Sequence, residues 1–383
     1  MNMDFHYYAT YLAARISGYD HHESMTICYS DQFTDVCTKT LLTRVGAPRS
    51  AATTQQPMEL ADARTDIYGL QDITRIWASF HFLPGDLYAE PEFKCTKRYK
   101  NKYRLICGVN GQLLSDTVEL AKGKGLEAAG IAMHVLSDTW AHSNFAGTPS
   151  LVINNTNYHF YETYEGRERK VTFRHSPGKE DDFDNGLYTN TIYQGSESSI
   201  MNLGHGRAGH IPDYSFMRYR YLPAWGDYEE IVKDNPGDYL KAFTQMIYAM
   251  KYLRGEIDVF VTDKYDTDAV KSIEGYLKDI FEKRQSDSCA DWKALVKRLY
   301  GEEIEDFNAE KYQDEYISAA DKDDSFIGRY IKGSLAQKSM VTNRIYRSGN
   351  LLAGYSVEYK QMGLKGIKDY WSLIIGRKVG GGR

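Results

Sequence analysis

The chain has 383 residues and a formal net charge of −5 at pH 7, which suits one large domain or two ordinary ones. Aromatic residues make up 13% of it, a composition that excludes a disordered chain. The acidic balance, with a pI near 6.1, gives no overall basic field that would attract nucleic acid or anionic lipid.

The cysteines and the chain start point to the cell interior. The five cysteines form no CxxC pair and are odd in number, so we predict reduced thiols rather than a disulfide framework. Residues 1–18 lack the basic start and apolar run of a signal peptide. No stretch approaches the ~18 uninterrupted apolar residues of a membrane span. We therefore expect a cytoplasmic protein with no stable membrane span.

Helical patterns open the chain. Apolar residues at helical spacing predict a helix over 4–17, and 19–37 predicts a second one. Asp20 and Glu23 are spaced as a capping box at the start of that second helix. Residues 41–70 are rich in Ala, Thr, Gln and Pro, which favours a loop with short turns.

The middle of the chain alternates between helical and polar segments. Residues 112–144 carry long helical patterns that break at the KGKG of 122–125. A polar insertion follows over 147–204, and the aromatic alternation in 158–175 is compatible with a hairpin or a long surface excursion. A helix is predicted over 235–255, since Pro stands near its start and Gly at its end.

The last part of the chain predicts a helical extension. Two amphipathic helices rich in opposite charges are expected in 265–285 and 289–307. The final fifty residues contain scattered apolar positions and end in the loose GRKVGGGR. We predict a mainly α protein with a helical domain at 1–258, which contains the polar insertion, and a C-terminal helical extension at 259–383.

One row of side chains in GIAMHVLSDTWAHSNFAG carries chemistry. His134, Asp138 and His142 stand four residues apart, so they share one broad stripe of a helix. Their neighbours are almost all apolar or small, and three ionisable groups are costly to bury unless they hold a metal or one another. A carboxylate between two imidazoles suits a bridging metal ligand. The alternative is a hydrogen-bonded buried core, and Trp140 beside the row is expected to be core as well.

Further His and Asp residues lie in aromatic-rich or glycine-rich segments. Asp31 and Asp35 are four apart, so we expect them on one helix face. His81 lies between aromatic residues just before a Pro-Gly turn, and GHGRAGH combines two histidines with glycines. His21, His22, His159 and His175 are expected at the surface. The additional candidates for a site are His6, Asp31, Asp35, His81, His205, His210 and Asp213.

The order of these residues resembles the zinc-dependent phospholipase C and S1/P1 nuclease superfamily. Its members are mostly α-helical and hydrolyse phosphodiesters with a trinuclear zinc cluster. The motifs MDFHYYATYLAARISGY, FHFLPG, GIAMHVLSDTWAH and GHG…PD look closest to an uncharacterised bacterial family with the same layout. The resemblance covers about residues 1–255 and implies a multi-helix bundle of phospholipase C/P1 nuclease type.

Carried over by position, the resemblance implies a set of metal ligands. Those of a first ion would be Asp35, His81, His134 and Asp138, with Asp138 bridging. Those of a second ion would be His142, His205 and Asp213, where His210 stays an alternative to His205. His6 would contribute to a third ion, yet the secreted enzymes complete that site with an N-terminal Trp and this chain starts at Met1. Two or three ions are therefore both compatible with the sequence.

The resemblance also implies roles around the metals. Asp35 and Asp138 would be the catalytic carboxylates. Residues that would support the ligands or contact the substrate are Asp4, Asp31, Trp140, Arg207 and His210.

The implied function is a metal-dependent hydrolase of a phosphate ester, with zinc or another divalent metal. The substrate would be a phosphodiester, such as a phospholipid head group or a nucleotide. The acidic chain argues against long nucleic acids, which need a basic track. The alternative is a non-catalytic, metal-stabilised helical scaffold whose C-terminal helices bind a protein partner or mediate self-assembly.

Overall fold

The computed structural model describes residues 1–63, 66–157, 159–176, 178–190, 195–227 and 229–354. About half of these residues are helical, so the expected mainly α architecture is confirmed. The longer helices are η1 (Asp4–Ala9), α1 (Thr10–Ile16), α2 (His21–Phe33), α3 (Lys39–Arg44), α4 (Pro57–Ala63), α5 (Ile67–Phe80), α6 (Lys97–Tyr103), α7 (Gln112–Ala121), α8 (Leu126–Ala141), α10 (Asn235–Leu253), α11 (Glu274–Glu282), α12 (Cys289–Tyr300), α13 (Gln313–Ser318) and α14 (Phe326–Arg347).

Short helices and strands complete the described chain. The short helices are η2 (Arg49–Ala51), α9 (Leu151–Asn154), η3 (Ile200–Asn202), η4 (Ile211–Asp213), η5 (Asp268–Val270) and η6 (Lys322–Asp324). The strands are β1 (Phe160–Tyr164), β2 (Arg167–Lys170), β3 (Thr172–Arg174), β4 (Leu187–Thr189), β5 (Arg218–Tyr221) and β6 (Ile231–Asp234).

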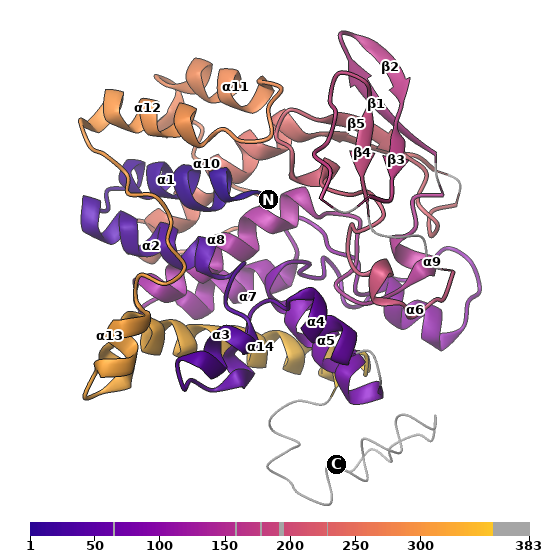
Figure 1. The fold of residues 1–383 in the computed structure, drawn as a ribbon, viewed down its shortest axis with the longest axis horizontal. Coiled ribbons are helices and arrows are strands. Elements are labelled where there is room, and N and C mark those ends of the chain that lie inside the picture. Colours follow the sequence, from indigo (N-terminus) through magenta and orange to yellow (C-terminus); the bar gives the residue numbers. More distant parts are fainter. Residues whose placement is uncertain (64–65, 158, 177, 191–194, 228, 355–383) are drawn as a thin grey trace, which may run out of the picture.

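Helix α8 is the central element of the fold. It is buried along nearly its whole length, and α2, α7, α10 and α14 pack around it (Figure 1). Gly130 of α8 permits the closest of these approaches, because a Cβ atom there would lie 2.3 Å from the carbonyl oxygen of Ile27 in α2. The two helices that carry Asp31 and His134 are therefore held unusually close together.

The first two helices follow their sequence signals with one difference. The capping box of α2 forms as expected, with Glu23 N donating to Asp20 Oδ1 and Asp20 N donating to Glu23 Oε2. Helix η1, which carries His6, has the wider π-helical turn before it continues as α1, and such turns are frequent at functional sites. The chain end that precedes it lies against α8 (Figure 1).

The polar insertion contributes small sheets beside the helices. Strands β1 and β2 form an antiparallel hairpin, one of the two conformations expected for 158–175. The larger sheet has the order β2-β1-β5-β6, and β3 and β4 form a separate parallel pair. Both lie to one side of the helical bundle (Figure 1).

One expectation from the sequence is wrong. Residues 41–70 are not mainly loop, because α3, α4 and the start of α5 occupy much of this range. Helix α14, with 22 residues, lies in the range 259–383, where a helical extension is predicted. Its buried side packs on α5 and α8. The GRKVGGGR end lies outside the described residues.

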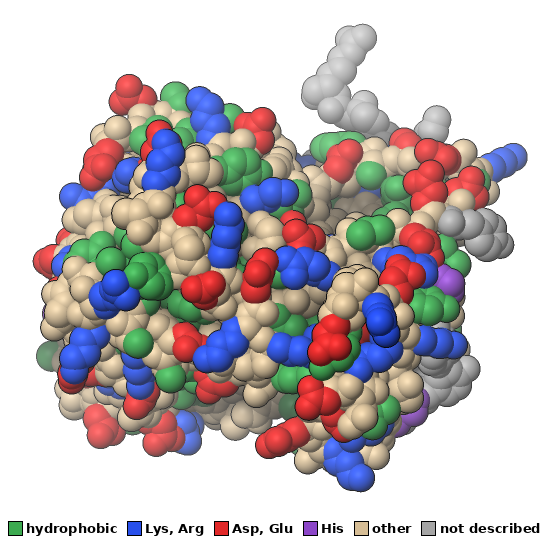
Figure 2. Space-filling model, turned by 90° about the horizontal axis from the view of Figure 1, so that it is seen from above, with side chains coloured by type: hydrophobic (Ala, Val, Ile, Leu, Met, Phe, Trp, Pro, Cys, Tyr) green, Lys and Arg blue, Asp and Glu red, His purple; other side chains and the backbone are tan. Residues whose placement is uncertain are grey.

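One cluster of buried apolar side chains runs from Met1 to Ala353. It contains residues from both sides of the boundary expected at residue 258, which stays a prediction. No described helix has both the length and the apolar character needed to cross a membrane. On the face that Figure 2 shows, acidic and basic side chains are interspersed.

Candidate metal centre

Histidine and aspartate side chains from distant segments converge at the C-terminal half of α8. His134 and Asp138 lie on the helix and His142 is its C-cap residue, while His6 comes from η1. The end of α5 supplies its C-cap residue His81. The ligand atoms of three groups lie within 4.8 Å of one another: His6, Asp31 and His134; Asp35, His81 and His134; and His142, His205 and Asp213.

Four side-chain atoms form a compact set that we call the first position: Asp35 Oδ1, His81 Nδ1, His134 Nε2 and Asp138 Oδ2. The two ring nitrogens are 3.2 Å apart, and each is 3.3 Å from Asp138 Oδ2. Asp35 Oδ1 lies 3.7 Å from His81 Nδ1 and 3.8 Å from His134 Nε2. Ligands placed tetrahedrally at about 2.0–2.1 Å from zinc are about 3.3 Å apart, so the set has nearly the required size.

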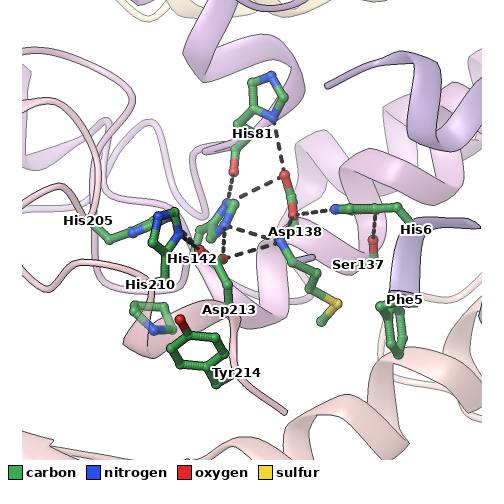
Figure 3. Close-up of polar contacts among 12 residues, drawn as sticks. Phe5, His6, His81, Ser137, Asp138, His142, His205, His210, Asp213 and Tyr214 are labelled. Carbon is green, nitrogen blue, oxygen red and sulfur yellow. Dashed lines mark hydrogen bonds and ion pairs between the residues drawn. The ribbon is translucent and has the colours of Figure 1, made fainter. Parts of the chain in front are cut away.

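The far ring nitrogens of His81 and His142 donate to backbone carbonyls. His81 Nε2 lies 3.0 Å from the oxygen of Thr53, and His142 Nδ1 lies 2.7 Å from the oxygen of His81. A carbonyl only accepts, so these nitrogens carry the ring hydrogen. In the neutral imidazoles the other nitrogen, which points into the cluster (Figure 3), then has the lone pair that a metal requires.

Asp31 orients His6 and His134 in the same way. Its Oδ1 atom lies 2.8 Å from His6 Nδ1 and 3.1 Å from His134 Nδ1, and Thr10 Oγ1 donates to Oδ2 at 2.6 Å. The Nε2 atoms of both rings are thereby directed at Asp138. His6 Nε2 is buried and makes no hydrogen bond, although it lies 3.2 Å from Asp138 Oδ1. Asp31 therefore supports ligands rather than forming a separate site.

Asp31 and Asp35 do not share a helix face, contrary to the sequence expectation. Helix α2 ends at Phe33, and Asp35 lies in the turn that follows. The turn directs Asp35 toward the inward nitrogens of His81 and His134, whereas Asp31 faces the outward nitrogens of His6 and His134.

A second position is formed by His142, His205 and Asp213. His142 Nε2 lies 3.0 Å from Asp213 Oδ1, and His205 Nε2 lies 3.5 Å from Asp213 Oδ2. His205 Nδ1 donates to the carbonyl of Gly209 at 2.7 Å, a contact that the positive φ of 60° at this glycine makes possible. His210 Nδ1 lies 3.4 Å from the same oxygen, Asp213 Oδ2, but its side chain is 66% exposed, whereas that of His205 is 16% exposed and its ligand atom groups with those of His142 and Asp213. Burial and grouping therefore favour His205 as the candidate ligand.

Two residues at the start of α10 fix the loop that carries Asp213. The side-chain amide of Asn235 donates to the carbonyls of Ile211, Pro212 and Tyr214. Tyr239 donates through its hydroxyl to the carbonyl of Asp213 at 2.7 Å. Both side chains are buried, so the second position is held by polar contacts rather than by a helix of its own.

The α-amino group of Met1 lies inside the cluster in this chain. It is 2.6 Å from Asp138 Oδ1, 3.3 Å from His142 Nε2 and 3.4 Å from Asp213 Oδ1. Despite its burial, the facing carboxylates of Asp138 and Asp213 raise the pKa of this amine to about 11. The Met1 amine and His6 are the neighbours of Asp138 Oδ1, whereas His81 and His134 are neighbours of Oδ2.

The electrostatics keep the central carboxylates ionised. Burial works to raise the pKa of Asp138, but His142, the Met1 amine and His134 hold it well below its usual range. The pKa of Asp213 is likewise held low against burial by His205 and the Met1 amine. Burial lowers the pKa of His205 to about 4, whereas Asp138 and Asp35 outweigh burial and raise that of His134 to about 10.

Three of the expected supporting residues lie apart from the ligand atoms. Asp4 accepts hydrogen bonds from the backbone and the hydroxyl of Ser288, so its carboxylate ties η1 to the C-terminal segment. Trp140 is buried and donates to Gln245, as expected for a core residue. Arg207 is also buried, and its Nε donates to Asn202 at 2.7 Å. His21 and His175 are exposed, and the side chain of His159 is 41% exposed, as expected.

The centre reaches solvent at two edges. The side chain of Asp35 is 32% exposed, whereas those of His81 and Asp138 are 4% and 1% exposed. On the other side, His210 and Tyr214 line a surface pocket of about 340 Å³ together with the N-terminal segment. Solvent therefore reaches the first position at Asp35, and the pocket lies beside His210, a neighbour of Asp213.

The fold and the site define a mainly helical protein with a buried His/Asp centre whose ligand-type atoms are close enough together to hold a metal ion. The chain belongs to the DUF6765 family, a family of unknown function whose model matches residues 1–345. Comparisons with curated proteins and with solved structures found no match.

Proposed function

We propose that this protein is a zinc-dependent hydrolase that cleaves a phosphate ester, a phosphodiester such as a phospholipid head group or a nucleotide. The observation that carries the proposal is the spacing around His81 and His134: their inward nitrogens are 3.2 Å apart, 3.3 Å from Asp138 Oδ2 and 3.7–3.8 Å from Asp35 Oδ1, close to the separations of ligands around zinc. The resemblance of the motif order to the phospholipase C and S1/P1 nuclease superfamily agrees with this function and with a bundle of that type.

The donor set fits zinc chemically. Imidazole nitrogens and carboxylate oxygens are ligands that zinc uses, and every inward nitrogen belongs to a ring whose other nitrogen is already hydrogen-bonded. The unpartnered, buried Nε2 of His6 is explained if it coordinates an ion together with Asp138 Oδ1. We therefore propose two ions at the first and second positions, and a third at His6.

Two features support hydrolysis of a phosphodiester: the number of protein ligands at the second position and the exposure of Asp35. The second position offers three protein ligands, the number typical of catalytic zinc sites. When bound, zinc acts as a Lewis acid on phosphoryl oxygens and supplies a hydroxide nucleophile near neutral pH. Asp35 is the most exposed of the carboxylates in the centre, and we assign its Oδ2 atom to accept a proton from the attacking water. Asp138 bridges the ligand groups through its two oxygens.

A metal-stabilised scaffold is the second candidate, and one observation favours it. The first position has four protein ligand atoms, as closed structural zinc sites do. In that case the C-terminal helices would bind a partner or mediate self-assembly. The scaffold predicts metal-dependent melting with no turnover of any phosphate ester.

The test is metal content combined with hydrolysis. Untagged protein, purified without chelator, is compared with a His134→Ala/Asp138→Ala variant and with the surface control His21→Ala. We expect two or three zinc ions per chain in the wild type and the control, and none in the double variant. Bis(p-nitrophenyl) phosphate should be hydrolysed, the activity lost on chelation and restored by zinc. Bound zinc without hydrolysis of this or of phospholipid and dinucleotide substrates would favour the scaffold, and well-folded protein without zinc would refute both.

A further inference from the structure

Helix α14 contributes no ligand atom, yet its buried face contacts the segments that carry the first position. The helix lies beyond residue 258 and packs against α5, α8 and η2 (Figure 1). Tyr330, Gln337 and Lys338 project from its buried face. Tyr330 and Gln337 hydrogen-bond to the residues one and two positions before Asp35 and His81, respectively. Lys338 bonds to the residue before Thr53, whose carbonyl holds His81.

Tyr330 links the two segments that place Asp35 and His81. Its hydroxyl donates to Thr34 Oγ1 at 3.0 Å and lies 3.2 Å from Thr53 Oγ1, which itself donates to the carbonyl of Thr34 at 2.7 Å. Thr34 directly precedes Asp35, and the carbonyl of Thr53 is the acceptor for His81 Nε2. All three hydroxyl-bearing side chains belong to residues that are fully buried.

Lys338 and Gln337 hold the backbone on either side of the hydrogen bond between His81 and the carbonyl of Thr53. Lys338 Nζ donates to the carbonyl of Ser50 at 2.7 Å and also to that of Ala52, the residue before Thr53. Gln337 Nε2 donates to the carbonyl of Ser79 at 3.1 Å, near the end of α5 and two residues before His81. The helix therefore holds three backbone segments around one imidazole.

We propose that α14 sets the geometry of the first ion position, with Tyr330 as its main positioning residue, through the Tyr330–Thr34–Thr53 hydrogen-bond network. The inference rests on the proposed metal centre. If the carbonyl of Thr53 turns away, His81 loses the partner that fixes its tautomer and ring orientation, and Asp35 loses the anchor of its turn. The second position has its own supports, Asn235, Tyr239 and the carbonyl of Gly209. Its link to the segments that α14 holds is indirect, through the main-chain carbonyl of His81 that accepts from His142, so we expect it to depend on α14 far less than the first position does.

The test measures zinc affinity by competition with a chromophoric chelator. Tyr330→Phe keeps the ring but removes the hydroxyl. Tyr248→Phe is the matched control, because Tyr248 is also buried and donates to a backbone carbonyl, that of Val259. Loss of a partner that orients a metal ligand typically weakens binding 10–100-fold, so we expect about tenfold for Tyr330→Phe and no change for the control. Adding Lys338→Met to Tyr330→Phe should weaken binding further.

Two backgrounds identify the affected ion. In a His205→Ala background, which keeps the first position, Tyr330→Phe should weaken the remaining tight site about tenfold. In a His81→Ala background, which keeps the second position, it should have little effect. The visible spectrum of bound Co²⁺ should change with Tyr330→Phe mainly in the His205→Ala background.

Three results would overturn the inference. Unchanged zinc affinity in Tyr330→Phe, with melting lowered as in the control, would leave the metal centre intact and refute the role of α14. Equal weakening in both backgrounds would indicate a global loss of structure. Wild-type protein that binds no zinc would refute the proposed function, and the inference with it.

Discussion

The two ion positions are built from different material. The first is assembled around helices: His81 caps α5, His134 and Asp138 belong to α8, and Asp35 lies in the turn after α2. In the second, His142 caps α8, but His205 and Asp213 come from residues 203–213. That segment has three glycines, ends in the short helix η4 and is held by side-chain contacts to backbone carbonyls. Elements anchored in a core hold ligands more firmly than loops do.

Because of this difference, we expect the two ions to have different roles, one bound tightly and the other involved in the reaction. Four protein donors on a rigid framework favour a tightly held ion with little freedom to exchange ligands. Three protein donors favour an ion that keeps a coordination position for water or substrate. We therefore expect the first ion to organise the centre and the second to meet the substrate.

The largest effect should come from Asp138, whose two oxygens face different sets of neighbours in the centre. Asp138→Asn keeps the shape of the side chain but removes the charge that faces His6, His134 and His142. We expect loss of all bound zinc and at least about a 10³-fold fall in phosphodiester hydrolysis. Metal-free Asp138→Asn should also be destabilised by about 3–5 kcal/mol, because buried cations lose their partner. Metal analysis, kinetics and urea unfolding measure these changes.

The matched control is Asp266→Asn, which removes a carboxylate that pairs with Lys251 outside the centre. It should keep the zinc content and the rate. Retention of one tightly bound ion by Asp138→Asn would show that the two positions do not share this carboxylate.

A comparison of neighbouring histidines separates the two positions next. His205→Ala should remove one zinc ion per chain and lower hydrolysis about 10²-fold, while the first ion stays bound. His210→Ala should keep the full zinc content, since its ring is mostly exposed and makes only the contact to Asp213 at 3.4 Å. Metal analysis of the two variants decides between them. The reverse pattern would assign His210 as the ligand.

The free energy of unfolding should depend on pH through Lys338, one of the residues that support the first position. Burial lowers the pKa of Lys338 to about 7 from 10.5. Between these two pH values the Lys338 amine is therefore neutral in the folded protein and protonated in the unfolded protein. Stability from this group should rise as pH increases from about 7 to 10.5 and be lowest below 7. Lys338→Met should remove this dependence, on the order of 4 kcal/mol, in urea unfolding at pH 7 and pH 10. Parallel pH curves for wild type and variant would contradict it.

The control for this measurement is Lys332→Met on the same helix. The Lys332 side chain is 58% exposed and pairs with Asp323 at the surface. We expect it to leave the pH dependence of the unfolding free energy unchanged.

Acid should distinguish the histidines of the two positions in metal-free protein. The pKa of His205 falls to about 4 from 6.5, so its stability contribution is lost as pH drops from 6.5 to 4, by up to about 3 kcal/mol. The pKa of His134 rises to about 10, so its contribution is complete below pH 6.5 and is lost only as pH rises toward 10. His205→Ala should therefore flatten the acid side of the stability profile, measured by urea unfolding at pH 6.5 and 4.5. An unchanged acid slope would refute this difference.

Several features of the centre were predictable because they are local. Spacing by four residues on α8 predicted that His134, Asp138 and His142 lie together, and the capping box placed the start of α2. The Asp31/Asp35 pair was read as one helix face because helical periodicity does not reveal where a helix ends. Thr10 stands four residues after His6 and therefore on the same face of the helix. This spacing could have predicted that the Thr10 hydroxyl also contacts the partner of His6, which is Asp31.

Other features had no sequence signal. Backbone carbonyls hold the rings of His81, His142 and His205, and every residue has a carbonyl. The docking of α14 on α5 and α8 had no sequence signal, because it depends on contacts between residues far apart in the chain. The role of Arg207 was also open, since only its fold neighbours show that it is buried beside Asn202.

The sequence by itself determined the mainly helical class and the identity of the candidate ligands, since residue type and helical spacing are local properties of the chain. Only the tertiary structure decided that Asp31 contacts the outward ring nitrogens of His6 and His134, that Asp35 lies in a turn rather than on the face of α2, and that the side chain of His205 is more buried than that of His210. It also decided which ring nitrogen of each histidine points inward. That orientation is set by hydrogen bonds between residues that are far apart in the chain.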